Sequence, residues 1–198
     1  MSSFETIKIK LGQFVKRYYT NELLKGTILF FAIGLLYLLI TLFVEYVLWL
    51  NPTARTVLFW VFIAVELGLF IKFIAITLMH LFNLRKGINH ETASKLIGEH
   101  FPQVSDKLLN VLQLNQNSVQ SDLLIASIEQ KSKQLQPVSF QSAIDFKSNT
   151  KYLKYAAIPL AVIVLSLVTG KMDWFNDSYE RVVNYKTAYE PPAPFQFF

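Results

Sequence analysis

Three charged side chains interrupt two otherwise apolar stretches of the sequence. Glu45 lies in the segment 26–50, and Glu66 and Lys72 lie in the segment 56–82. An ionisable group at the centre of a bilayer costs about 2.5–3.5 kcal/mol on insertion scales, so such a residue needs a compensating contact or a function. The chemistry open to them is proton or ion coupling, or ion pairing with another helix.

Glu66 is the most costly of the three charges. It follows Thr56 by ten residues, which places it about 15 Å along a helix. Lys72 comes six residues later, about 240° further around the helix axis, so the two side chains do not share a face. Glu45 is near the end of its segment and is expected to reach the headgroup zone. Simple polar contact within a helix bundle, with Lys72 extending to the interface, remains an alternative.

Other chemistry finds no support in the residue pattern. His90 and Glu91 begin an HExxH motif, but Ser94 stands where the second histidine belongs. The chain has no cysteine, no glycine-rich phosphate loop and no basic patch interleaved with aromatic residues. We therefore expect no catalytic residue, no metal site, no cofactor and no nucleic-acid partner.

Three apolar segments predict the architecture. Hydrophobic residues make up 53% of the chain and charged residues 17%. Segments 26–50 and 56–82 are each long enough to cross a hydrocarbon core of about 30 Å, and 155–172 is a shorter third span. Residues 51–55 are expected to form a tight hairpin, and Pro159 to lie in the first turn of the third helix. Burial inside a soluble protein is the alternative.

The lysine and arginine distribution predicts the orientation. Residues 1–25 carry five of these cations, the hairpin carries one, residues 83–154 carry nine, and the chain beyond Gly170 carries three. Because cytoplasmic loops are enriched in lysine and arginine, we expect a cytoplasmic N-terminus and a periplasmic C-terminus in a bacterial inner membrane.

Residues 1–25 are predicted to form an amphipathic cytoplasmic helix. Ser2 and Glu5 have the spacing of a capping box. One interpretation places the apolar face on the inner leaflet of the bilayer, and the other packs it on the chain's own helical unit. That face consists of Phe4, Ile7, Leu11, Phe14 and Tyr18.

Residues 83–154 are predicted to form a small cytoplasmic helical unit. Within 89–136, Asn89, Ser105 and Ser121 can each cap a short helix, the last one ending before Pro137. These helices share few apolar positions, so we expect a thin core and a cytoplasmic partner at this surface. Residues 138–146 are expected to be extended.

Residues 173–198 are predicted to begin an extracytoplasmic region. The stretch 173–189 is expected to form a short helix and then a strand, and the proline-rich "EPPAPFQFF" to lead into a sheet domain. We therefore expect the chain to be the N-terminal portion of a longer protein.

Two motifs carry a resemblance to a known family. "HFPQVSDKLLN" and "EPPAPFQF" resemble a domain-of-unknown-function family of large bacterial inner-membrane proteins. The resemblance implies three N-terminal spans followed by a long extracytoplasmic region. That family is sometimes labelled as an ATPase, but this sequence contains no Walker motif that would support the label. The resemblance supplies no catalytic residues.

The sequence as a whole predicts an all-α membrane protein with three transmembrane helices, an N-terminal amphipathic helix and a small cytoplasmic helical unit. The function favoured is a non-enzymatic scaffold subunit of a multi-protein envelope complex, serving protein export or envelope biogenesis. Its expected partners are other integral membrane proteins, the bilayer and the cytoplasmic partner at 89–136. The alternatives are an ion-coupled energy transducer that uses Glu66 and, less favoured, a sensor.

Overall fold

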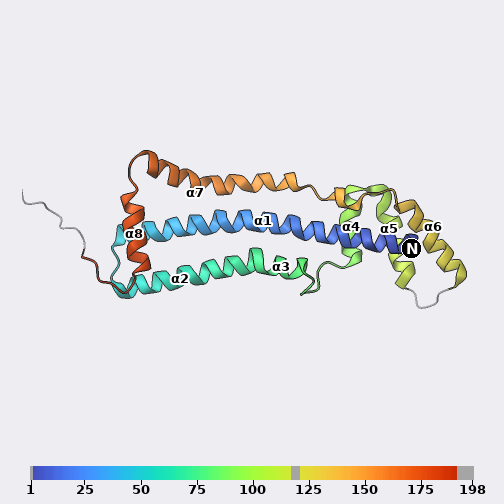
Figure 1. The fold of residues 1–198 in the computed structure, drawn as a ribbon, viewed down its shortest axis with the longest axis horizontal. Coiled ribbons are helices and arrows are strands. Elements are labelled where there is room, and N and C mark those ends of the chain that lie inside the picture. The colour runs from blue at the N-terminus through green and yellow to red at the C-terminus, as the bar shows by residue number, and fades with distance from the viewer. Residues whose placement is uncertain (1, 117–120, 191–198) are drawn as a thin grey trace, which may run out of the picture. The chain divides into compact units, whose positions relative to one another are not determined.

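The computed structural model describes residues 2–116 and 121–190, which are mainly helical and include no strand. This confirms the all-α class, whereas the strand expected within 173–189 is not formed. The elements are α1 (Ser3–Leu48), α2 (Pro52–Phe70), the π-helix η1 (Ile71–Ala75), α3 (Ile76–Leu81), α4 (His90–His100), α5 (Pro102–Gln116), α6 (Asp122–Leu135), the 3₁₀ turns η2 (Phe140–Ala143) and η3 (Phe146–Asn149), α7 (Thr150–Val168) and α8 (Asp173–Val183) (Figure 1).

Three stretches are long and apolar enough to cross a membrane by length and composition. They are Ser3–Leu48, Pro52–Leu81 and Phe140–Val168, and they agree with the three spans expected from the sequence. The amphipathic helix expected over residues 1–25 and the first span are parts of one helix, because α1 continues from Ser3 to Leu48 without a break. Strong helix formers (Glu22 to Lys25) lie at the expected boundary, and Gly26 alone costs too little to end the helix.

The chain divides into two compact units. Unit 1 comprises Met1–Leu24 and Thr77–Ser148, and unit 2 comprises Lys25–Ile76 and Asn149–Phe198. Helix α1 contributes its first part to unit 1 and the rest to unit 2.

Unit 1 is a helical unit whose core includes the N-terminal part of α1. Helices α4, α5 and α6 contribute most of the buried apolar side chains, and the apolar face of α1 packs into the same core. The core residues are Phe4, Ile7, Leu11, Phe14, Ala93, Ile97, Val104, Leu108, Val111, Leu112, Ile128, Leu135 and Phe140.

This core decides between the two interpretations of the N-terminal helix. Ile7, Leu11 and Phe14 are fully buried, and Phe4 is 8% exposed. Tyr18 is half-buried and stacks on Phe14 with ring centroids 6.5 Å apart. The first four side chains are therefore not available to an inner-leaflet surface, and the structure matches packing on the chain's own helical unit.

Local capping signals in unit 1 give a mixed outcome. The side chains of Asn89 and Ser121 accept hydrogen bonds from the N–H groups of Thr92 and Leu124, as expected for helix caps. The cap predicted at Ser105 is wrong, because α5 begins three residues earlier at Pro102, whose ring suits the first helical position. The extended segment predicted at 138–146 is also wrong, since 3₁₀ turns form there.

Replacing Leu11 by alanine should destabilise unit 1 by about 2–5 kcal/mol, because it deletes fully buried methyl groups. Amide hydrogen exchange in α4 and α5 would report the change as faster exchange. Ile9, on the same helix and 47% exposed, provides the control. If Leu11→Ala and Ile9→Ala changed exchange equally, the core assignment would be contradicted.

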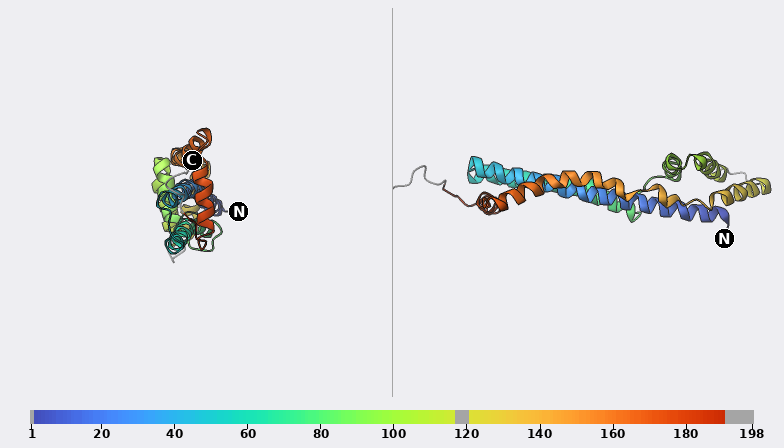
Figure 2. Two further views of the ribbon diagram at one scale, coloured as in Figure 1. Left: turned by 90° about the vertical axis from the view of Figure 1, so that its left-hand side faces the viewer. Right: turned by 90° about the horizontal axis from the view of Figure 1, so that it is seen from above.

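Unit 2 is built from the hairpin of α1 and α2, with α7 alongside α1 and α8 across the end of the hairpin (Figure 1). The second part of α1 lies between α2 and α7, and its Ala32, Leu39 and Leu42 are buried. The views in Figure 2 agree that α7 follows the course of α1. Most large apolar side chains on α2 and α7 are exposed, as expected of helices that face lipid.

Two boundaries in unit 2 differ from the sequence prediction. Residues 51–55 do not form the turn alone, because Pro52 already begins α2 and the side chain of Asn51 accepts a hydrogen bond from the Ala54 N–H. Helix α7 begins at Thr150, so Pro159 lies inside the helix and not in its first turn. A proline there removes one backbone hydrogen bond within the helix.

Candidate functional site

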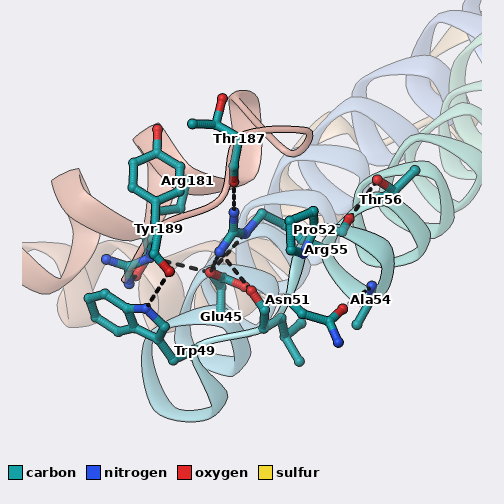
Figure 3. Close-up of polar contacts among 12 residues, drawn as sticks. Glu45, Trp49, Asn51, Pro52, Ala54, Arg55, Thr56, Arg181, Thr187 and Tyr189 are labelled. Atoms are coloured by element: carbon teal, nitrogen blue, oxygen red, sulfur yellow. Dashed lines mark hydrogen bonds and ion pairs between the residues drawn. The ribbon is translucent and has the colours of Figure 1, made fainter. Parts of the chain in front are cut away.

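A buried cluster of three charged side chains lies where α1, α2 and α8 meet. The Oε1 atom of Glu45 is 2.9 Å from Nη2 of Arg55 and 3.3 Å from Nε of Arg181 (Figure 3). The side chains of Glu45 and Arg55 are fully buried, and that of Arg181 is 5% exposed. Glu45 therefore forms ion pairs with two arginines inside the protein, which is one of the two roles that its sequence position left open.

Each charge comes from the terminal part of a different helix. Glu45 lies in the last turn of α1, Arg55 follows the capped start of α2, and Arg181 lies near the end of α8. The α1–α2 connection is only three residues long, so it holds Glu45 and Arg55 close together. Arg181 arrives from 136 positions further along the chain.

Arg55 also binds two backbone carbonyl groups. Its Nη1 donates to the carbonyl of Thr187 at 2.8 Å, and its Nη2 donates to the carbonyl of Leu50 at 2.7 Å. The planar fork of an arginine suits such a set of fixed acceptors. Arg55 thus joins the α1–α2 connection to the segment that follows α8.

The cluster has two positive charges and one negative charge, and an aromatic ring lies against each arginine. The guanidinium of Arg181 lies 4.0 Å from the ring centroid of Trp49, and that of Arg55 lies 5.1 Å from the ring of Tyr189. Trp49 has a φ of 45° and donates from Nε1 to the carbonyl of Tyr189 at 3.4 Å. Cation–π contacts of this kind stabilise a desolvated arginine.

The cluster fits a structural role. A buried ion pair returns little net stability, because desolvation offsets much of the attraction, but loss of one partner leaves an uncompensated buried charge. Within the described residues, Oε2 of Glu45 has no hydrogen-bond partner. The two arginines, which contact Oε1, therefore provide the main compensation for the buried negative charge of Glu45. The arrangement therefore holds α8 and residues 184–189 in one position on the hairpin.

Glu66 occupies a different position in unit 2, against α1. It is half-buried on α2, and a methyl group placed on Gly34 would lie 2.7 Å from its Oε2 atom. The absence of a side chain at Gly34 thus makes room for the carboxylate. Oε1 of Glu66 is buried without a hydrogen-bond partner among the described residues. A shallow pocket of about 250 Å³ lies here, lined by Phe30, Phe31, Gly34, Leu35, Leu38, Phe62 and Glu66.

Lys72 is not brought to Glu66. It lies exposed in the π-helix η1, with its Nζ atom 5.4 Å from the ring centroid of Phe73. No ion pair joins Lys72 to Glu66 in the described part of the chain, as expected from their separation around the helix. Glu45, Glu66 and Lys72 thus do not form one site.

Sequence reasoning missed Arg55 and Arg181 as the partners of Glu45. One signal was available: Arg55 lies near the N-terminal end of a helix, where the helix dipole disfavours a cation. A cation in that position indicates a nearby anion, and Glu45 is the nearest acid across the predicted hairpin. No comparable local signal marks Arg181.

The described residues contain no group of three or more histidine, aspartate or glutamate side chains that could hold a metal ion. Comparisons with protein-family models, with curated proteins and with solved structures find no match to this chain.

Proposed function

We propose that the chain is a non-enzymatic membrane anchor and scaffold subunit of a multi-protein envelope complex. The observation that carries the proposal is the buried cluster of Glu45, Arg55 and Arg181, which ties α8 and the segment after it to the membrane hairpin. A fixed exit from the membrane suits a subunit that positions an attached extracytoplasmic region. Protein export or envelope biogenesis is the process that such an assembly would serve.

The proposal places the chain in a bacterial inner membrane, with the N-terminus in the cytoplasm and the C-terminus in the periplasm. The excess of lysine and arginine in residues 1–25 and 83–154 supports this orientation. Unit 1 is then cytoplasmic, and the ion cluster lies at the periplasmic end of the hairpin. The resemblance to large inner-membrane proteins of unknown function supports the same arrangement.

The surface of unit 1 supports a cytoplasmic partner at residues 89–136. Leu123 and Ile125 on α6 are 84% and 50% exposed. A groove of about 210 Å³ lies beside Ile125, lined on its other side by Leu114 and Phe4. An exposed apolar side chain beside a groove, as Ile125 is, is typical of protein interaction sites, and Leu123 presents a second apolar side chain on another side of α6.

Affinity purification in mild detergent, followed by mass spectrometry, should recover other integral membrane proteins together with this chain. The double change Leu123→Ser, Ile125→Ser should remove any cytoplasmic partner and leave the membrane partners bound. The exposed Val183→Ser change, in unit 2, is the matched control. Recovery of the native chain alone would contradict the scaffold proposal.

The second candidate function is an ion-coupled energy transducer that uses Glu66. The space at Gly34 and the buried Oε1 atom without a partner favour it. Glu66→Gln keeps the size of the side chain and removes its charge. Loss of function with assembly and abundance intact would favour transduction, whereas unchanged function or lost assembly would favour the anchor.

A further inference from the structure

A groove in unit 2 lies between α1, α7 and the turn that leads into α8. Its volume is about 600 Å³, within the roughly 300–1,000 Å³ typical of ligand sites. Most of the surface lining it is apolar, and its position on the three-span unit exposes it to lipid. The apolar lining residues are Leu39, Ile40, Phe43, Tyr46, Val162 and Trp174.

Trp174 forms a fixed wall at one end of this groove. Its Nε1 atom donates to the hydroxyl of Ser166 at 3.3 Å, and its ring contacts Tyr46 edge-on with centroids 6.4 Å apart. Tryptophan and tyrosine gather at the headgroup level of membranes, because their rings have an apolar body and a polar edge. This end of the groove is thus suited to the boundary between acyl chains and headgroups.

Two opposite charges line the same end of the groove. Lys171 lies in the turn between α7 and α8, Asp173 is the first residue of α8, and both side chains are exposed. Neither side chain forms an ion pair within the described residues. Helix α8 also begins here, and Met172 offers no side-chain cap for its first N–H groups. The N-terminal helix dipole adds partial positive charge near Lys171.

We propose that this groove binds one glycerophospholipid with a phosphoethanolamine headgroup. An acyl chain lies along Leu39, Phe43 and Val162, the phosphate pairs with Lys171, and the ammonium group pairs with Asp173. A cation and an anion separated by one residue match the phosphate and ammonium of a zwitterionic headgroup. An ammonium with hydrogen-bond donors also suits a carboxylate better than the methylated ammonium of phosphocholine does.

The proposal goes beyond the anchor function and needs only that unit 2 lies in a membrane. Lipid retention is measured on the purified chain, so its outcome is independent of which proteins co-purify. A lipid held at this point would seal the space beside α7, where the spans meet α8.

The test is native mass spectrometry of the full chain released from nanodiscs made with phosphatidylethanolamine, phosphatidylglycerol or phosphatidylcholine. We expect one retained phosphatidylethanolamine, and weaker retention of the other two. Val162→Trp should abolish retention by filling the groove, whereas Val164→Trp, on an exposed position of α7 outside the groove, should not.

Charge variants test the headgroup contacts. Lys171→Ala and Asp173→Ala should each reduce phosphatidylethanolamine retention by about fivefold, as loss of a partly exposed ion pair would. Lys186→Ala, outside the groove, is the control. Tryptophan fluorescence of each variant checks that unit 2 remains folded. Equal retention by Val162→Trp and Val164→Trp, no retained lipid in the native chain, or equal retention of all three lipids would overturn the proposal.

Discussion

Replacing Glu45 by glutamine is expected to lower the free energy of unfolding of unit 2 by about 3–5 kcal/mol, because it leaves two buried arginines without their anion. Glutamine preserves the size of the side chain, so the effect reports the charge. All three tryptophans of the chain lie in unit 2. Tryptophan fluorescence during thermal unfolding in detergent would therefore follow this unit alone.

The matched control for this change is Glu180→Gln, an exposed acid next to Arg181 on α8. It should leave the unfolding temperature nearly unchanged. The triple change of Glu45, Arg55 and Arg181 to leucine should recover part of the loss, since no buried charge remains. Recovery would be incomplete, because Leu50 and Thr187 lose the donors to their carbonyl groups. Equal effects of Glu45→Gln and Glu180→Gln would rule out a stabilising role for the cluster.

Gly26→Ala is expected to destabilise unit 2 by about 1–3 kcal/mol, the typical cost of overpacking. A methyl group on Gly26 would overlap the carbonyl oxygen of Phe73 and would lie 3.1 Å from its carbonyl carbon. Both are backbone atoms of the π-helix η1 and cannot rotate away. Helix α1 and η1 would have to separate, and their packing would be lost.

Gly68→Ala provides a control with the opposite sign. Gly68 lies in α2, and a methyl group added there would have nothing within 4 Å, so alanine should stabilise the helix by about 0.5–1 kcal/mol. Thermal unfolding followed by tryptophan fluorescence should thus shift down for Gly26→Ala and up for Gly68→Ala. An upward shift for both would show that α1 does not approach η1 as closely as the structure indicates.

Predictions that rest on neighbouring residues succeeded most often. The caps at Asn89 and Ser121 form within four residues of the capping side chain, so the sequence contains all the required information. Ser105 is also a residue type that commonly caps helices, but α5 begins three residues before it, at Pro102. The sequence pattern also did not show that the helix over residues 1–25 and the first span form one helix, which the strong helix formers before Gly26 allow.

Predictions about what covers an apolar face or compensates a charge could not be made from the pattern alone. The spacing of Phe4, Ile7, Leu11 and Phe14 shows that one face of α1 is apolar, but lipid and protein both satisfy that face. Likewise, Glu45 required a partner, but Arg181 is far away in the sequence. Only the return of the chain through α7 and α8 brings it there.

The amino-acid sequence by itself determined the helical class, the three apolar spans and the helix caps at Asn89 and Ser121, because hydrophobicity, length and hydrogen bonding within a few residues are local properties. Only the tertiary structure decided that the N-terminal face is buried in unit 1, that Glu45 binds Arg55 and Arg181, and that Glu66 rests against Gly34. Those contacts join segments far apart in the chain, and a local pattern does not specify which distant segments meet.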